Sequence, residues 1–115
     1  MEQEPTEVAV TEPNYLESQE EFESYIDESE VLIVDFFAGW CGPCKMMDPV
    51  LETIAADTPA SVLKVDVDDH QSLAAEHDVR GVPTIKVYAN GEPVNRLVGY
   101  QDESTLRKVV TNLAE

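Results

Sequence analysis

The chain has few cysteines and lacks long apolar stretches. Its 115 residues include two cysteines, Cys41 and Cys44, too few for the several disulfides that stabilise small secreted domains. No stretch reaches the roughly 18 apolar residues that a membrane-spanning helix requires. The chain starts MEQEPTEVAV, with neither the basic start nor the apolar segment of a secretion signal. We therefore expect a cytoplasmic protein that does not span a membrane.

Basic residues are also scarce. Seven Lys and Arg stand against 24 Asp and Glu, which gives a formal net charge of -17. Such a surface repels phosphate backbones and anionic lipids, so nucleic acids and membrane surfaces are excluded as expected partners. Small size and high like charge also favour a monomer. The acidity serves solubility, and it fits adaptation to a salt-rich (halophilic) cytoplasm, where counterions screen the self-repulsion.

The chain does contain enough apolar residues, 43%, for one folded domain. Residues 1–13 are polar and acidic without periodicity, and we interpret them as a flexible N-terminal extension before a single domain of residues 14–115. Apolar runs and alternations predict strands near 31–37, 61–67, 84–88 and 94–98, and we expect order to begin near Asn14 or Tyr15 with a further strand. Helical spacing follows each of the first three strands and closes the chain. This order predicts an α/β fold with a mixed sheet and helices on its faces.

The segment Trp40-Cys41-Gly42-Pro43-Cys44 carries the chemistry. Two cysteines three positions apart at a helix start have Cβ atoms about 5–6 Å apart, close enough for a disulfide after small local adjustment. The helix N-terminus stabilises a thiolate at Cys41, whereas apolar surroundings keep Cys44 a neutral thiol. This asymmetry suits Cys41 to attack a disulfide and Cys44 to resolve the product.

A CxxC pair can also be half of a zinc site. His70 and His77 would have to complete it, but they are spaced more widely than the about three to five residues usual between histidine ligands. We therefore expect no metal, and we interpret both histidines as solvated residues on or near a short helix.

Asp35 interrupts the apolar run of residues 31–37. A carboxylate in a central strand is buried, and its pKa is expected to be raised. The strand runs directly into the CxxC loop, which places Asp35 behind the cysteines. We interpret Asp35 as a buried base that exchanges a proton with Cys44. The alternative is an Asp that faces solvent.

Residues 34–45, VDFFAGWCGPCK, resemble the active-site region of thioredoxins. Further similarities follow in the family's order, at Pro49, Lys64-Val65-Asp66-Val67-Asp68, Gly81-Val82-Pro83-Thr84, Asn90-Gly91 and Val98-Gly99. The resemblance covers roughly residues 15–113, and WCGPC is far more specific than a bare CxxC. It implies a thioredoxin fold, a mixed five-stranded sheet flanked by four helices. Phe37 and Gly39 depart from the family, which often has Trp and a bulkier residue there.

The resemblance also assigns roles around the cysteines. It implies a cis peptide bond before Pro83 and a lysine, Lys64, that modulates the ionisation of Asp35. Gly42 and Pro43 resemble the pair between the cysteines of reducing family members. A largely apolar docking surface for extended substrate segments is implied at Trp40, Gly42, Pro43, Val82, Pro83, Val98 and Gly99.

The expected function is therefore protein-disulfide reduction by dithiol–disulfide exchange, which keeps cytosolic thiols reduced and donates electrons to reductive enzymes. The expected partners are disulfide-containing proteins and a separate thioredoxin reductase, because the chain has no nucleotide-binding fingerprint and no bound cofactor is implied. Two alternatives remain at this stage. One is a thioredoxin-like interaction module without turnover, and the other is a more oxidising disulfide isomerase.

Overall fold

The computed structural model describes residues 12–114. The expected N-terminal extension, residues 1–13, therefore lies almost entirely outside the described residues.

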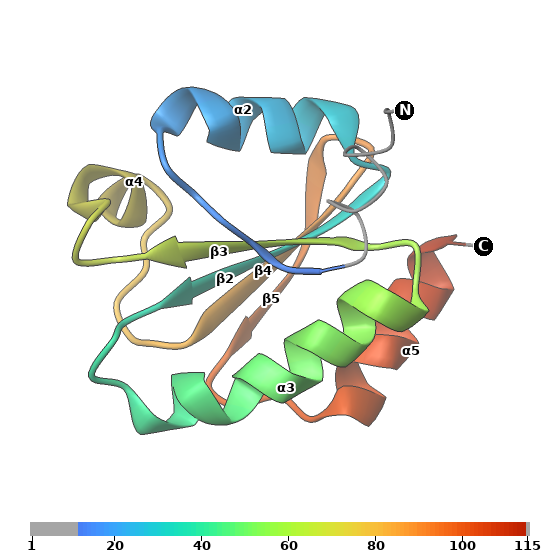
Figure 1. Ribbon diagram of the computed structural model, residues 1–115. Helices are drawn as coiled ribbons and strands as arrows, with labels where there is room; N and C mark the ends of the chain where they lie inside the picture. The colour runs from blue at the N-terminus through green and yellow to red at the C-terminus, as the bar shows by residue number, and fades with distance from the viewer. Residues whose placement is uncertain (1–11, 115) are drawn as a thin grey trace, which may run out of the picture.

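Within residues 12–114, five strands form one mixed sheet in the order β1-β3-β2-β4-β5 (Figure 1). The strands are β1 (Asn14–Tyr15), β2 (Val31–Phe37), β3 (Ser61–Asp66), β4 (Thr84–Ala89) and β5 (Glu92–Val98). β3 runs parallel to both β1 and β2, whereas β4 is antiparallel to both β2 and β5. β2 lies at the centre, as its nearly continuous apolar sequence predicts. The predicted mixed five-stranded sheet is confirmed.

Four helices in the same part of the chain cover the two faces of the sheet (Figure 1). They are α2 (Gln19–Glu28), α3 (Gly42–Asp57), α4 (Gln71–Glu76) and α5 (Glu103–Ala114). α3 and α5 pack on one face through a core that includes Met47, Leu51 and Leu106. α2 and α4 pack on the other through Phe22 and Leu73. None of these helices has the length and apolar content needed to cross a bilayer.

Successive side chains of β2 point alternately to the two faces of the sheet, and so pack against different pairs of helices. Val31 and Ile33 belong to the core under α3 and α5, whereas Leu32, Val34 and Phe36 belong to the core under α2 and α4. Side chains two positions apart in a strand point to the same face. The odd-numbered residue 35 therefore points toward the α3 layer, the layer that carries the cysteines.

Local hydrogen bonds fix the helix that precedes β2. The Ser18 side chain accepts a hydrogen bond of 3.4 Å from the Glu21 N–H and so caps α2. In a full capping box the Glu21 carboxylate would accept from the Ser18 N–H. Here it accepts from the Glu17 N–H at 3.0 Å, one residue earlier. The N-terminus of α2 is therefore where the sequence predicts it, with a shifted second contact.

The late hairpin closes the sheet. Asn90 and Gly91 have φ values of 52° and 87°, and they form the tight turn between β4 and β5 that this pair predicts. β5 begins at Glu92, two residues earlier than expected, and forms an edge of the sheet. Pro93 lies in this edge strand, where its missing N–H is tolerated.

Candidate redox-active site

The two cysteines lie where the central strand leads into α3. Cys41 is the N-cap residue of α3 and Cys44 lies in its first turn. The two form a disulfide with their Cα atoms 5.3 Å apart. The Cys44 N–H donates a hydrogen bond of 3.1 Å to Cys41 Sγ. Because this N–H is one of the unpaired donors of the helix start, it can also stabilise a thiolate at Cys41 once the bond is reduced.

The disulfide lies in an apolar setting beside exposed residues. Ala38, Cys41 and Cys44 form a buried cluster, against which Phe37, Val67 and Val82 pack. The residues that flank Cys41 are exposed, with Trp40 at 72%. Both cysteines are themselves nearly buried, at 4% and 2% exposed, so the exposed residues beside Cys41 mark the side from which a partner chain can approach.

A second loop completes this surface. The Val82–Pro83 peptide bond is cis, as the resemblance implies. The Gly99 N–H donates a hydrogen bond of 2.8 Å to the Pro83 carbonyl oxygen, and Val98 pairs with Thr84. Val98 is 65% exposed. The residues expected to dock substrates thus meet at one end of the sheet, although their role in docking stays a prediction.

Trp40 faces a shallow hollow of about 180 Å³ at this end. Its lining consists of Trp40, Val67, Val79, Arg80, Gly81 and Val82. Trp40 Nε1 donates a hydrogen bond of 3.1 Å to Asp68 Oδ2, which fixes the indole ring across the loop. No role was predicted from the sequence for Asp68 or Arg80. Because Trp40 is largely exposed, its N–H could also donate to water, and nothing in the sequence identified Asp68 as its acceptor.

Asp35 is fully buried on the face that α3 covers. Its register neighbours are Lys64 on β3 and Ile85 on β4. Asp35 Oδ2 accepts a hydrogen bond of 2.8 Å from Lys64 Nζ, whereas Oδ1 is buried and has no hydrogen-bond partner among residues 12–114. Burial raises the pKa of Asp35, and the ammonium of Lys64 opposes the rise without cancelling it. The expected burial and direction of the shift agree with the structure, and the solvent-facing alternative is wrong.

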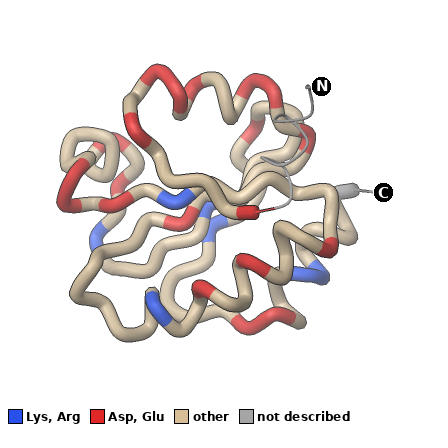
Figure 2. The backbone as a smooth tube through the Cα atoms, in the orientation of Figure 1, with Lys and Arg blue, Asp and Glu red and all other residues tan. Residues whose placement is uncertain are grey.

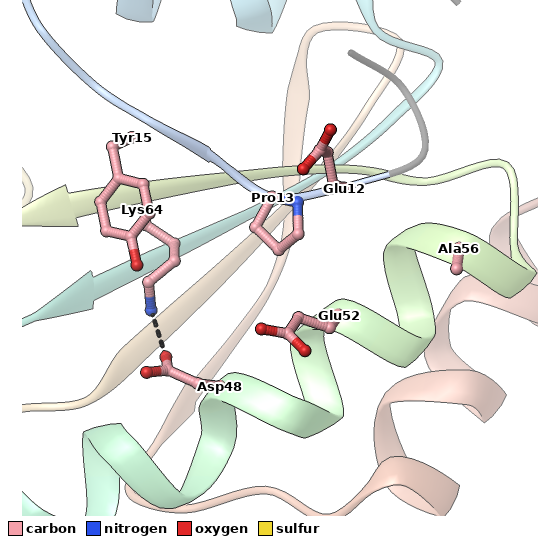
Figure 3. Close-up of a pocket in the computed structure, with 7 residues that line it drawn as sticks. All are labelled: Glu12, Pro13, Tyr15, Asp48, Glu52, Ala56 and Lys64. Atoms are coloured by element: carbon pink, nitrogen blue, oxygen red, sulfur yellow. Dashed lines mark hydrogen bonds and ion pairs between the residues drawn. The ribbon is translucent and has the colours of Figure 1, made fainter. Parts of the chain in front are cut away.

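Lys64 has a second carboxylate partner. The lysine is buried, and its Nζ lies 2.8 Å from both Asp35 Oδ2 and Asp48 Oδ1. Figure 3 shows the contact with Asp48. The same nitrogen lies 4.4 Å from the centroid of the Phe37 ring. Burial alone lowers the pKa of Lys64, but Asp35 and Asp48 together raise it above its usual value. The family resemblance predicted that Lys64 lies near Asp35, but the contact between Lys64 and Asp48 was not predicted.

The histidines are placed differently from their expected solvated positions. They flank α4 as its N-cap and C-cap residues. His70 Nε2 lies 3.1 Å from the Leu16 carbonyl oxygen. The His77 ring packs on Phe22 and Phe36, with centroid distances of 5.0 and 5.7 Å. Burial lowers the pKa of His77. Among the described residues, no three His, Cys, Asp or Glu side chains gather where a metal ion could be held.

Comparisons with known proteins agree with this geometry. The thioredoxin family model matches residues 14–112. A thioredoxin of Staphylococcus aureus is 48% identical over 92 residues, which span 78% of this chain and 88% of that protein.

Two solved structures are also similar to the chain. A mutant thioredoxin of Halobacterium salinarum is 44% identical, with a TM-score of 0.89 over 93% of this chain and 95% of that one. Oxidised thioredoxin of Plasmodium falciparum is 39% identical, with a TM-score of 0.78 over 89% and 98% of the two chains. The chain belongs to the thioredoxin family of thiol-disulfide oxidoreductases, and Cys41 and Cys44 are its pair for dithiol–disulfide exchange.

Proposed function

We propose that the chain is a general protein-disulfide reductase in which Cys41 attacks and Cys44 resolves. The Cys41 thiolate attacks one sulfur of a substrate disulfide, and the other substrate sulfur leaves as a thiolate that takes a proton from water. Cys44 then attacks Cys41 Sγ, closes the internal disulfide and releases the second substrate sulfur. The observation that carries this order is the position of Cys41 at the N-cap of α3, where its Sγ accepts a hydrogen bond from the helix start, with Cys44 in the first turn.

We further propose that Asp35 is the base for the second step. Cys44 must lose a proton before it can attack, and a buried carboxylate with a raised pKa takes a proton readily. The unpartnered Oδ1 of Asp35 leaves a lone pair free for that proton, directly or through one water. The proton then has to return to solvent before the next cycle. Lys64 modulates the step through its ion pair with Asp35.

The substrate-docking role belongs to the surface around the cis bond. The backbone of Val82 can pair with an extended substrate segment, while Trp40, Pro43 and Val98 supply exposed apolar contacts. The Pro83 carbonyl oxygen accepts a hydrogen bond from Gly99 and so holds this loop, and Gly42 borders open space, where an added Cβ would have no atom of another element within 4 Å.

Replacing Trp40 with alanine should weaken docking without touching the chemistry. We expect the KM for reduction of insulin disulfides to rise about tenfold, since exposed aromatics are frequent binding hot spots. The rate with a small aromatic disulfide should stay unchanged. The control is Val94→Ala, which removes an exposed apolar side chain from β5 far along the strand from Val98. Equal KM values for both variants would contradict the docking role of Trp40.

Family membership implies disulfide-bonded proteins as substrates and a reductase as partner. We propose that the reductase is a separate thioredoxin reductase, that the chain acts as a monomer and that it works in a reducing cytoplasm. Insulin reduction by purified chain with NADPH and a thioredoxin reductase tests the reaction. Sustained turnover supports the proposal. Partner binding without turnover would instead favour an interaction module, and a reduction potential well above that of glutathione would favour an isomerase.

The acidic surface gives a prediction about salt. Red segments cover α2 and the loop before α4, whereas blue segments are few and scattered (Figure 2). We propose that the chain is adapted to high salt, because counterions screen this repulsion and the Debye length falls to about 3 Å at 1 M. The melting temperature of the oxidised protein should therefore rise steadily from 0.1 M toward about 2 M KCl.

The control is a variant with Glu23→Gln, Asp27→Asn and Glu28→Gln, three exposed acids of α2, of which Asp27 and Glu28 lie in its last turn. Negative side chains in this last turn are repelled by the negative end of the helix dipole. This variant should melt higher than the parent at low salt and gain less from KCl. A melting temperature that stays constant or falls with salt contradicts the adaptation.

A further inference from the structure

One ammonium group serves two carboxylates from different elements. Lys64 Nζ donates hydrogen bonds of 2.8 Å to Asp35 Oδ2 on β2 and to Asp48 Oδ1 on α3. Asp35 has no exposed surface, whereas the side chain of Asp48 is 43% exposed. The shared nitrogen therefore links a buried acid to an acid that water can reach.

Asp48 faces a hollow of about 460 Å³ between β1 and α3. The lining residues are Glu12, Pro13, Tyr15, Asp48, Glu52, Ala56 and Lys64. Figure 3 shows the Lys64 side chain extending from β3 to the Asp48 carboxylate, with the Glu52 carboxylate on the next turn of α3. Among the lining residues Lys64 is the cation, and Glu12, Asp48 and Glu52 carry carboxylates. The buried Asp35 accepts a hydrogen bond from the same lysine. From β4, the register neighbour of Asp35 is the uncharged Ile85.

We propose that Asp48 is a positioning residue that sets the ionisation of Asp35 through the ammonium they share. This inference rests on the proposed role of Asp35 as the base for Cys44. Asp48 lies one turn after Cys44 on α3, but its carboxylate accepts a hydrogen bond from Lys64 and it acts through that lysine, which is why it is a positioning residue and not a catalytic one.

The physical reason is competition for one positive charge. Lys64 alone beside Asp35 would favour the carboxylate and make it a weak base toward a thiol. Asp48 offsets part of this stabilisation of the Asp35 carboxylate, because a second negative charge beside the same ammonium repels that carboxylate. The Coulomb effect of Asp48 on Asp35 has this direction and raises the pKa of Asp35. Asp48 therefore keeps Asp35 protonatable despite its ion pair.

Replacement of Asp48 by asparagine separates charge from structure. The amide oxygen of the new side chain can still accept the Lys64 hydrogen bond, and the site is partly exposed, so the fold should be kept. Glu52→Gln is the matched control, since it removes one charge from the same helix and the same hollow without removing an ion pair to Lys64. Asp48→Glu tests rescue by a carboxylate of similar reach.

Two readouts apply to the full-length chain. Carboxyl NMR of the oxidised protein follows the titration of Asp35 directly. Release of the second thiolate from an equimolar aromatic disulfide reagent, followed by stopped flow across pH, reports the attack of Cys44 on the mixed disulfide. For Asp48→Asn we expect the Asp35 titration and the acid limb of the rate profile to move to lower pH by about 0.5 to 1 unit. Glu52→Gln should move both by less than half as much, and Asp48→Glu should restore the parent values.

The outcomes separate this inference from the proposed role of Asp35. If Asp48→Asn moves the Asp35 titration no more than Glu52→Gln does, the inference about Asp48 is wrong whatever the rates show. If Asp35→Asn leaves the second-thiolate release and its pH profile unchanged, the role of Asp35 is wrong, and the NMR titration still decides on Asp48. A matching shift in both readouts supports both.

Discussion

Replacing Cys41 with serine is expected to reduce insulin-disulfide turnover to the background rate, and replacing Cys44 with serine is expected to trap the substrate. Serine at position 41 leaves no thiolate at the helix N-cap, so the first S–S bond is never attacked. Serine at position 44 leaves that attack intact but removes the sulfur that resolves the mixed disulfide. Non-reducing mass spectrometry after addition of a disulfide-bonded protein should therefore show an adduct on the Cys44 variant only.

The double replacement supplies the control for this pair. It should form no adduct, and it should retain the fold because both positions are occupied by a side chain of nearly the same size. Normal turnover by the Cys44 variant would show that the second sulfur comes from elsewhere, and the two-step scheme would be wrong.

Replacing Asp35 with asparagine is expected to slow release of the second thiolate by about 10²-fold, the lower end of what a positioned general base contributes. The first thiolate should be released at the parent rate, because that step depends on Cys41. The measurement is the same two-phase thiolate release that tests Asp48. Loss in both phases equally would indicate a general structural defect and not a missing base.

The same variant tests the raised pKa of Asp35 through stability. A carboxyl group whose pKa is higher in the folded than in the unfolded chain stabilises the fold fully below its unfolded pKa of about 3.9, and this contribution is lost as pH rises through the folded pKa. Each unit of pKa difference corresponds to about 1.4 kcal/mol. Urea unfolding of the oxidised proteins should show Asp35→Asn gaining stability relative to the parent as pH increases from 4 toward the folded pKa. A constant difference across this window would contradict the raised pKa.

Much of the fold followed from local patterns. The run of residues 31–37 predicted a strand buried on both faces, and β2 has this position between β3 and β4. Asn90-Gly91 predicted the hairpin turn, and its positive φ values explain why. The burial of Asp35 followed from the same reasoning, because a polar residue inside such a strand has no solvent-facing position. The cis bond before Pro83 came from family resemblance alone, since nothing local in the sequence specifies it.

The missed contacts have a common physical origin. Asp48 and Asp68 are charged residues, and such residues are normally solvated. Their roles depend on Lys64 and Trp40, which come from distant parts of the chain and meet them only in the fold. His77 was expected to be a solvated residue on or near a short helix, yet its ring packs against Phe22 and Phe36. Long-range pairs of this kind are set by the packing of layers and have no periodic signature.

Alkylation of the reduced chain with iodoacetamide across pH, with peptide mapping of each sulfur, tests most directly whether the helix start creates an attacking thiolate. We expect Cys41 to be modified first, and its reactivity to follow an apparent pKa below the value of about 8.5 for a free cysteine. Cys44 should react only slowly, because its sulfur lies one turn inside α3 and does not receive the helix-start hydrogen bond that Cys41 Sγ accepts. Modification of Cys44 first, or titration of Cys41 at or above the free-cysteine value, would contradict the account.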